Sequence, residues 1–156
     1  MRVVVQRVSE AGVEVDGKVV SSIGPGILVL AAFRNSDTDA DLDWMARKCL
    51  ELRVFEDAGG KMNRSVLETE GAVLVVSQFT LYGDCRKGRR PDFFASAPAE
   101  TAARLYRTFL DIMGAYYPKV AEGVFGAKMS VRLVNDGPVT LVIDRGGGTG
   151  EEDAQR

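Results

Sequence analysis

The sequence contains no histidine among its 156 residues. This absence excludes the Ser-His-Asp triad, the Cys-His pair and a catalytic zinc held by histidine. Two cysteines, Cys49 and Cys85, are too few for a four-thiolate zinc site or a dense disulfide framework. An enzyme of this composition must therefore work without the side chain that titrates closest to neutral pH.

Long apolar runs are also missing from the chain. No stretch approaches the roughly 18 apolar residues that cross a bilayer, and the N-terminal segment alternates too early to be a signal peptide. With two separated cysteines, we expect a cytoplasmic protein and no membrane partner. The formal net charge of -2 argues against a general nucleic-acid coat, and we expect no DNA partner.

The C-terminal segment, residues 146–156, differs in composition from the rest of the chain. It is rich in glycine, carries three acidic residues and one basic residue, and has no apolar anchor. Such a segment cannot bury enough surface to fold, so we expect it to be disordered. Residues 1–145 show no linker and no repeat, which predicts a single compact domain.

Apolar and β-branched runs predict strands over residues 2–8, on both sides of Asp16-Gly17, and over 27–33, 53–55, 72–77, 127–134 and 139–143. Apolar residues at helical spacing predict two helices. The first starts near Asp37, with Ser36 or Asp37 as its cap, and Cys49 lies on its apolar stripe; the second starts near Pro98. The pattern predicts an α/β domain of the α+β type, in which two helices pack against mainly antiparallel sheets.

Three segments carry the polar chemistry of the sequence. Residues 77–80 place Ser, Gln and Thr at the end of a buried strand, where backbone N–H groups lose their ladder partners. Residues 86–90 hold four cations on a loop rich in Gly and Pro, which suits phosphate binding. Residues 135–140 contain Asn-Asp-Gly-Pro, an ordinary turn sequence. Each segment alone also fits a plain explanation: a strand end, a solvated charged loop, and a turn with a trans proline.

Five segments of the chain, taken together in their order along the sequence, identify a family more specifically than any one of them does. The start Met1–Val8, then Val76–Leu81, Lys87–Pro91, Gly123–Ala127 and Asn135–Thr140 closely resemble the D-aminoacyl-tRNA deacylases, also called D-tyrosyl-tRNA deacylases. The resemblance covers residues 1 to about 145. It implies a hydrolase that frees D-amino acids and glycine from tRNA during translational proofreading, and a homodimer whose active sites lie at the subunit interface.

The resemblance also implies roles for individual residues. The pocket motif is Ser77, Gln78, Phe79 and Thr80. The pair Gly137-Pro138 is held in cis and enters the partner subunit's pocket, where its main-chain carbonyls exclude an L side chain, and Arg7 holds this pair. The segment around the adenosine is represented by Phe125, Gly126 and Met129.

Ester hydrolysis also needs an activated water and a site for the developing oxyanion. The family pattern favours assistance from the 2′-hydroxyl of the terminal adenosine, with no metal and no cofactor. Thr80 is then a positioning residue first and a nucleophile second, because a threonine hydroxyl is weak without a nearby base. Backbone N–H groups near Phe79 and Thr80 are the candidates for the oxyanion site, and we expect the tRNA phosphates to contact Arg86, Lys87, Arg89 and Arg90.

Two other functions remain open from the residues alone. One is a general esterase with a Ser or Thr nucleophile and a lysine base. The other is a tRNA-binding module that uses the basic loop and performs no chemistry.

Overall fold

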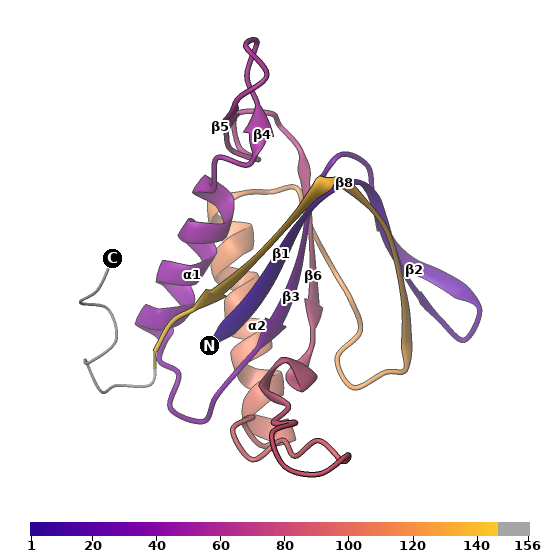
Figure 1. The fold of residues 1–156 in the computed structure, drawn as a ribbon, viewed down its shortest axis with the longest axis vertical. Coiled ribbons are helices and arrows are strands. Elements are labelled where there is room, and N and C mark those ends of the chain that lie inside the picture. The colour runs from indigo at the N-terminus through magenta and orange to yellow at the C-terminus, as the bar shows by residue number, and fades with distance from the viewer. Residues whose placement is uncertain (147–156) are drawn as a thin grey trace.

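The computed structural model describes residues 1–146 as eight strands, two α-helices and one short 3-10 helix (Figure 1). The strands are Arg2–Val15 (β1), Lys18–Ile23 (β2), Gly26–Ala32 (β3), Phe55–Glu56 (β4), Met62–Arg64 (β5), Ala72–Ser77 (β6), Val120–Glu122 (β7) and Met129–Asp144 (β8). The helices are Asp39–Glu51 (α1), Phe79–Tyr82 (η1) and Ala99–Tyr116 (α2). Except for Gly146, the tail that the composition predicts to be disordered lies outside the described residues.

Strand β1 is the centre of the main sheet. Its first half pairs with β3 on one edge, its second half pairs with β2 on the same edge, and β8 follows it along the other edge. All these pairings are antiparallel, whereas β3, β6 and β7 run parallel to one another. The parallel pairs follow from their connections, because the chain crosses over through α1 and then through α2 before it returns to the sheet.

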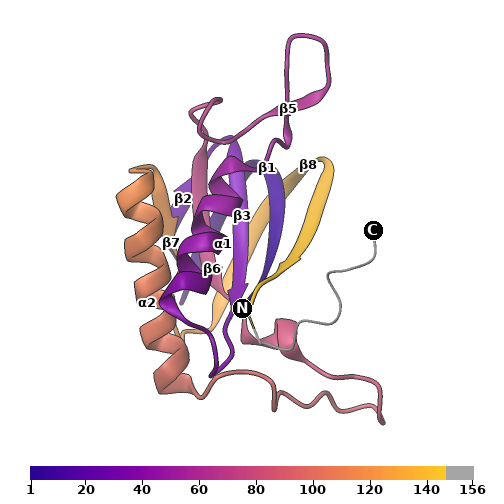
Figure 2. The ribbon, with the colours of Figure 1, turned by 90° about the vertical axis from the view of Figure 1, so that its left-hand side faces the viewer.

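The fold has three layers, and Figure 2 shows both helices on one side of the sheet. The helices bury Leu42, Met45, Phe109 and Met113 against the sheet face that includes Val29. On the opposite face, the second half of β1 folds over with β2 and β8 and forms a second core around Leu28, Leu74 and Val76. Strand β3 is covered on both faces, which explains its continuous apolar sequence.

The start of α1 differs from the sequence prediction. Thr38 is the cap: its hydroxyl accepts from the Asp41 backbone N–H, and the Asp41 carboxylate accepts from the Thr38 backbone N–H. Asp37 lies outside the helix and is buried, where its carboxylate pairs with the Met1 ammonium at 2.5 Å. The predicted cap was wrong because Asp37 serves a tertiary ion pair that no local pattern shows.

The C-terminal strand also differs from the prediction of two strands around a turn. Residues 129–144 form the single strand β8, paired with β1 on both sides of an irregularity. Thr140 pairs with Gln6 and Asn135 pairs with Val8, so four residues of β8 lie opposite Arg7 alone. The Gly-Pro segment is therefore a large bulge within one strand.

The two predicted helices and the single α+β domain are confirmed. No helix in the described part of the chain is long and apolar enough to cross a membrane.

Candidate active site

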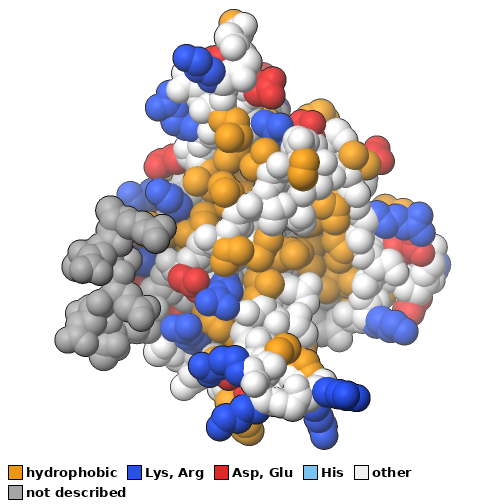
Figure 3. Space-filling view, in the orientation of Figure 1, with side chains coloured by type: hydrophobic (Ala, Val, Ile, Leu, Met, Phe, Trp, Pro, Cys, Tyr) orange, Lys and Arg blue, Asp and Glu red, His pale blue; other side chains and the backbone are white. Residues whose placement is uncertain are grey.

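An apolar pocket opens where the parallel strands β3 and β6 end. Ala32 ends β3 and Phe33 follows it, and Val76 and Ser77 close β6, so the pocket lies at the carboxyl ends of both strands. Ligands of open α/β sheets commonly bind at such an edge. The pocket has a volume of about 760 Å³. Figure 3 shows hydrophobic side chains in a hollow on this face, with many Lys and Arg side chains below it.

Side chains from four parts of the chain form the pocket walls. Ser77, Gln78 and Phe79 contribute one wall; Phe125, Gly126 and Met129 contribute the wall from the β7–β8 connection and β8. The structure therefore brings together six of the sequence-predicted residues. The remaining walls are formed by the start of α2 and by the loop before it, at Phe93, Phe94, Ser96, Ala97, Pro98, Ala99 and Ala102.

Direct contacts fix the loop before α2 to the start of η1 and to the residue that follows β3. The Ser96 hydroxyl donates to the Phe79 carbonyl at 3.0 Å, and the rings of Phe79 and Phe93 meet edge to face at 5.1 Å. The Ala97 N–H donates to the Phe33 carbonyl at 2.8 Å. This wall has no signature in the sequence, because Phe-Phe-Ala-Ser-Ala has no helical or strand period and only its tertiary contacts mark it.

Tyr106 supports the pocket from beneath. Its hydroxyl donates to the Val75 carbonyl at 2.9 Å, and its ring lies 5.8 Å from the ring of Phe125. Burial raises the pKa of Tyr106 to about 12, so the hydroxyl stays protonated and keeps this bond. The strand that carries Ser77 is thereby linked to the wall that carries Phe125.

Thr80 does not line the pocket. It is exposed in η1, and its hydroxyl accepts from the Gln78 side-chain amide. An amide cannot remove a proton from a hydroxyl, so the structure gives Thr80 no general base at this contact. The geometry agrees with a positioning role for Thr80 better than with a nucleophilic role.

The Gly-Pro bulge lies at the other end of the sheet. The Gly137–Pro138 peptide bond is cis. Arg7 pairs with Ile27, and Ile27 pairs with Val73 of β6, four residues before Ser77. At about 3.3 Å per residue, the bulge and the motif end lie roughly 13 Å apart along the strands. One chain therefore does not place its own Gly-Pro segment at its own pocket.

Arg7 holds the bulge from below. Its guanidinium is almost fully buried and donates from Nε to the Asp136 carbonyl at 3.0 Å and from Nη1 to the Val54 carbonyl at 2.6 Å. Gly137 has a φ of +128°, and a Cβ there would lie 2.9 Å from Arg7 Nη2. Glycine is therefore required at 137 both by the backbone conformation and by the close approach of the arginine.

The basic loop is exposed, as the sequence predicts. Arg86 is paired with Asp84 at 2.6 Å, and this contact lowers the pKa of Asp84 to about 2. Lys87, Arg89 and Arg90 form no ion pair with any described residue.

Two further features bear on what the chain can do. Cys49 is buried, and desolvation raises its pKa to about 12, so this thiol is not a nucleophile. Residues 1–146 contain no group of three or more His, Cys, Asp or Glu side chains that could hold a metal ion.

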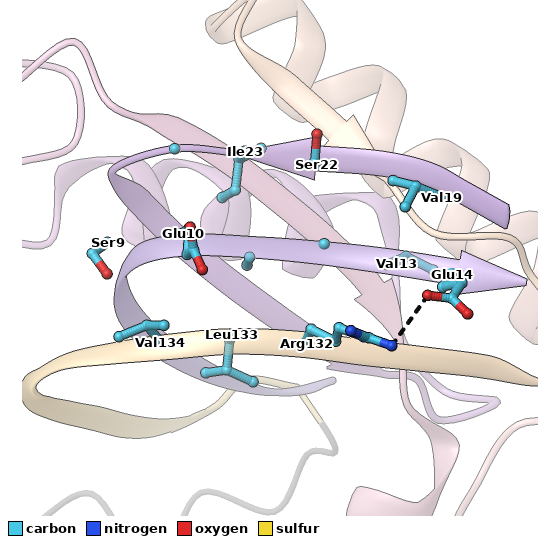
Figure 4. A pocket seen from close by; sticks show the side chains of 13 residues that line it. Ser9, Glu10, Val13, Glu14, Val19, Ser22, Ile23, Arg132, Leu133 and Val134 are labelled. Carbon is cyan, nitrogen blue, oxygen red and sulfur yellow. Dashed lines mark ion pairs between the residues drawn. The ribbon is translucent and has the colours of Figure 1, made fainter. Parts of the chain in front are cut away.

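A second hollow, of about 530 Å³, lies between β1, β2 and β8. Figure 4 shows it as a groove on the strands, beside the ion pair of Arg132 with Glu14 at 3.4 Å. None of the sequence-predicted site residues lines this hollow.

Comparison with known proteins decides the family. The family model described as D-Tyr-tRNA(Tyr) deacylase matches residues 4–144. The chain belongs to this family. The matched range contains the pocket motif at residues 77–80, the pocket residues Phe125, Gly126 and Met129, and the Gly-Pro bulge.

Curated relatives and solved structures agree with this assignment. Proteins named D-aminoacyl-tRNA deacylase from Desulfitobacterium hafniense and Thermomicrobium roseum are 58% and 56% identical over 144 residues, which cover 92% of this chain and 97% and 94% of theirs. A solved structure named c-Myc DNA Unwinding Element Binding Protein is 43% identical with a TM-score of 0.90, and covers 94% of this chain and 100% of its own. A structure described as a probable eukaryotic D-amino acid tRNA deacylase is 23% identical with a TM-score of 0.81, and covers 92% and 98%; it shows the same fold.

Proposed function

We propose that this chain hydrolyses the ester between a D-amino acid and the terminal adenosine of tRNA, and that it accepts glycyl-tRNA in the same way. Membership of the deacylase family supports the reaction class. The observation that carries the proposal is the pocket, where the motif Ser77–Phe79 faces Phe125 and Gly126 across an apolar space of about 760 Å³. Aromatic and apolar walls with a few polar groups suit a nucleoside with a small attached acyl group.

The active enzyme is a homodimer whose pockets are completed across the interface. The Gly-Pro bulge is a built feature, held by the buried Arg7, yet it lies at the far end of the sheet from its own pocket. In a two-fold dimer, the bulge of one subunit meets the pocket of the other, and the reverse contact forms by symmetry. The exposed apolar side chains of β8, Val134, Leu141 and Val142, supply surface for such an interface.

A main-chain wall explains how the site distinguishes D from L. The carbonyl groups of Gly137 and Pro138 occupy the space that an L side chain needs, whereas a D side chain points away from them. Because the wall consists of backbone, it does not depend on the identity of the D side chain. Glycine has no side chain to exclude, so glycyl-tRNA passes the same filter.

The hydrolytic step uses one water and no covalent intermediate. The water oxygen bonds to the acyl carbon, the bond from that carbon to the ribose oxygen breaks, and the released ribose oxygen takes a proton. The 2′-hydroxyl of the terminal adenosine assists the water, and N–H groups at the start of η1, near Phe79 and Thr80, stabilise the oxyanion. Thr80 contributes by its bond with Gln78, which orients the amide beside the pocket.

The rest of the tRNA contacts the basic loop. Arg86, Lys87, Arg89 and Arg90 lie on the exposed loop that leads into the pocket wall at Phe93 and Phe94. Phosphate contacts from such a loop fix the position of the acceptor end without reading its sequence. Because the substrate belongs to translation, we place the activity in the cytoplasm.

The test is a deacylation assay with D-tyrosyl-tRNA, L-tyrosyl-tRNA and glycyl-tRNA. We expect amino acid release from the D and glycyl substrates and none from the L substrate. Equal cleavage of D and L would overturn the chiral wall, and salt-sensitive tRNA binding without release would indicate a binding module. The rate of hydrolysis should fall to nearly zero for substrates that end in 2′-deoxyadenosine. An unchanged rate would instead indicate that Thr80 is the nucleophile.

A further inference from the structure

A separate hollow lies on the other side of η1 from the pocket, with a volume of about 630 Å³. Its charged and aromatic lining consists of Arg2, Arg34, Tyr82, Asp84 and Arg86, and we call it the arginine hollow. It shares its walls with the pocket, because neighbouring residues in the same segments face opposite ways. Phe33 lines the pocket and Arg34 lines the arginine hollow, and the same alternation holds for Phe94 and Ala95.

Two guanidinium groups in this hollow are held against one aromatic ring. The Arg34 guanidinium lies 4.8 Å from the centre of the Tyr82 ring, and the Arg2 guanidinium lies 5.4 Å from it. Tyr82 is only 6% exposed, so the ring is a fixed platform rather than a mobile surface group. The negative face of the ring attracts a cation, so both guanidinium groups are held over Tyr82 before any ligand arrives.

The charge of Arg34 has no partner among the described residues. Arg2 pairs with Asp144 at 2.8 Å, and Arg86 pairs with Asp84 at 2.6 Å. No carboxylate in residues 1–146 lies within ion-pair distance of the Arg34 side chain. The nearby Asp37 carboxylate instead accepts from the Arg34 backbone N–H at 2.7 Å and pairs with the Met1 ammonium. The hollow therefore contains a half-buried, oriented guanidinium whose charge is not offset.

The arginine hollow is also linked to the catalytic segment. Arg2 Nη1 donates to the Leu81 carbonyl at 3.1 Å, within η1, and η1 also contains Phe79 and Thr80 of the pocket motif. A ligand on these arginines would therefore hold the segment that carries Phe79 and Thr80. A planar guanidinium with a free donor edge matches the geometry of a phosphate group.

We propose that the arginine hollow binds the phosphate group on the 5′ side of the terminal adenosine, with Arg34 as the main contact. The inference rests on the proposed deacylase function and adds a phosphate site distinct from the exposed cations of residues 87–90. The pocket takes the adenosine and its acyl group, and the chain of the tRNA leaves across η1, where the next phosphate meets the stacked guanidinium. Arg34 is thus a binding residue for the tRNA end, outside the reacting atoms.

The experiment compares two small substrates that differ by one phosphate, D-tyrosyl adenosine and D-tyrosyl adenosine 5′-monophosphate, each acylated on the ribose. For the unaltered protein we expect kcat/KM to be about tenfold higher with the phosphate, mainly through KM. Arg34→Gln should lose that advantage and cleave the unphosphorylated substrate within about twofold of the unaltered rate. Arg34→Lys should recover only part of it, because an ammonium keeps the charge but not the planar fork.

Lys61→Gln is the matched control. Lys61 lies in the β4–β5 turn, at the opposite end of the molecule from the basic loop (Figures 1 and 2). This variant also loses one positive charge, and kcat/KM should stay unchanged for both substrates. With whole tRNA, Arg34→Gln should also lower the slope of log affinity against log salt by about 0.7, as expected for one lost contact to a single strand. An equal loss on both small substrates, or no phosphate advantage in the unaltered protein, would overturn this inference while leaving the deacylase function intact. Failure to release D-tyrosine from any substrate would overturn both.

Discussion

The two ends of the parallel strands β3 and β6 differ in how their polar groups are held. At the pocket end, the Ser77 hydroxyl makes no hydrogen bond to a described residue, and Phe79 and Thr80 are exposed in a short helix. At the opposite end, the almost fully buried Arg7 donates hydrogen bonds to the Asp136 carbonyl of the bulge and to the Val54 carbonyl. The first end leaves a hydroxyl without a partner, as the proposed substrate pocket requires, whereas the second end is held in one shape.

This difference shows that the two parts of the proposed site, the substrate pocket and the Gly-Pro wall, lie at opposite ends of the sheet and meet different structural demands. A wall that excludes L side chains must not move, because a shift of about 1 Å would admit them or block the D substrate. A pocket that receives the substrate must leave its polar groups free for that ligand. Placing the two on different ends lets the rigid part be built into the core and the receptive part remain open, provided that a second subunit brings them together.

The largest expected effect is a complementation between two inactive variants. Gly137→Val should abolish activity through the bulge, because valine fits neither the φ of +128° nor the space beside Arg7. Gln78→Ala combined with Phe79→Ala should abolish activity through the pocket. Mixed by joint refolding, the two proteins should regain about one quarter of normal activity, since half of the dimers are mixed and each has one intact site. A mixture that stays inactive, while both variants fold and dimerise, would place the bulge and pocket of a working site in the same chain.

A second test compares stability at the two ends. Arg7→Met should lower the free energy of unfolding by about 2–4 kcal/mol, because it leaves the buried Val54 carbonyl without its donor. Ser77→Ala should lower it by less than about 1 kcal/mol, because that hydroxyl has no partner to lose. Denaturant unfolding measures both, and Arg47→Met on the exposed face of α1 serves as a control for arginine loss. Equal losses for Arg7 and Ser77 would remove the contrast between the two ends.

Thr80→Ala should have a smaller effect. Because the Thr80 hydroxyl lies outside the pocket lining and contacts only the Gln78 amide, its loss should lower kcat/KM by about tenfold or less. Thr80→Ser, which keeps the hydroxyl, should restore the rate. A loss of more than a thousandfold on Thr80→Ala would mean that this hydroxyl attacks the ester itself.

The smallest effect is expected from pH. The largest pKa shifts in the structure all lead away from neutrality: the pKa of Asp84 falls to about 2, while the pKa values of Cys49, Tyr82 and Tyr106 rise to about 12. Because the lowered Asp84 pKa favours the charged form, its contact with Arg86 is complete above about pH 4 and is lost only as pH falls toward 2. With no histidine in the chain, the rate from pH 5.5 to 8 should rise smoothly or stay flat. A bell-shaped profile with an inflection near 6.5 would reveal a titrating protein group that the site does not contain.

Much of this fold is visible in the sequence, for local reasons. The apolar stripes of α1 and α2 and the run of β3 are local patterns, and each predicts its element correctly. The single strand β8 was missed because Asn-Asp-Gly-Pro is a normal turn sequence, and only pairing with β1 on both sides shows a bulge. The cap at Thr38 was missed because Asp37 also fits the pattern and is used by the distant Met1 ammonium.

The site was less visible than the fold. The residues at 77–80, 125–129 and 137–138 were found through their resemblance to a family, since each segment alone has an ordinary structural explanation. The wall at Phe93–Ala99 and the stacked arginines at 2 and 34 have no sequence signal, because their partners are remote in the chain. Tertiary contacts decide these features, and no window of local sequence contains them.

The bulge in β8 also sets a rule for how this segment can vary. Because β8 pairs with β1 on both sides of Arg7, adding or removing one residue between Asn135 and Thr140 must either change the shape of the bulge that Arg7 holds or shift one of the two paired stretches. A shift of one residue turns every side chain of a strand to the opposite face. The length of this segment is therefore fixed by the strands around it, more strictly than its composition, and insertions in related chains should fall elsewhere.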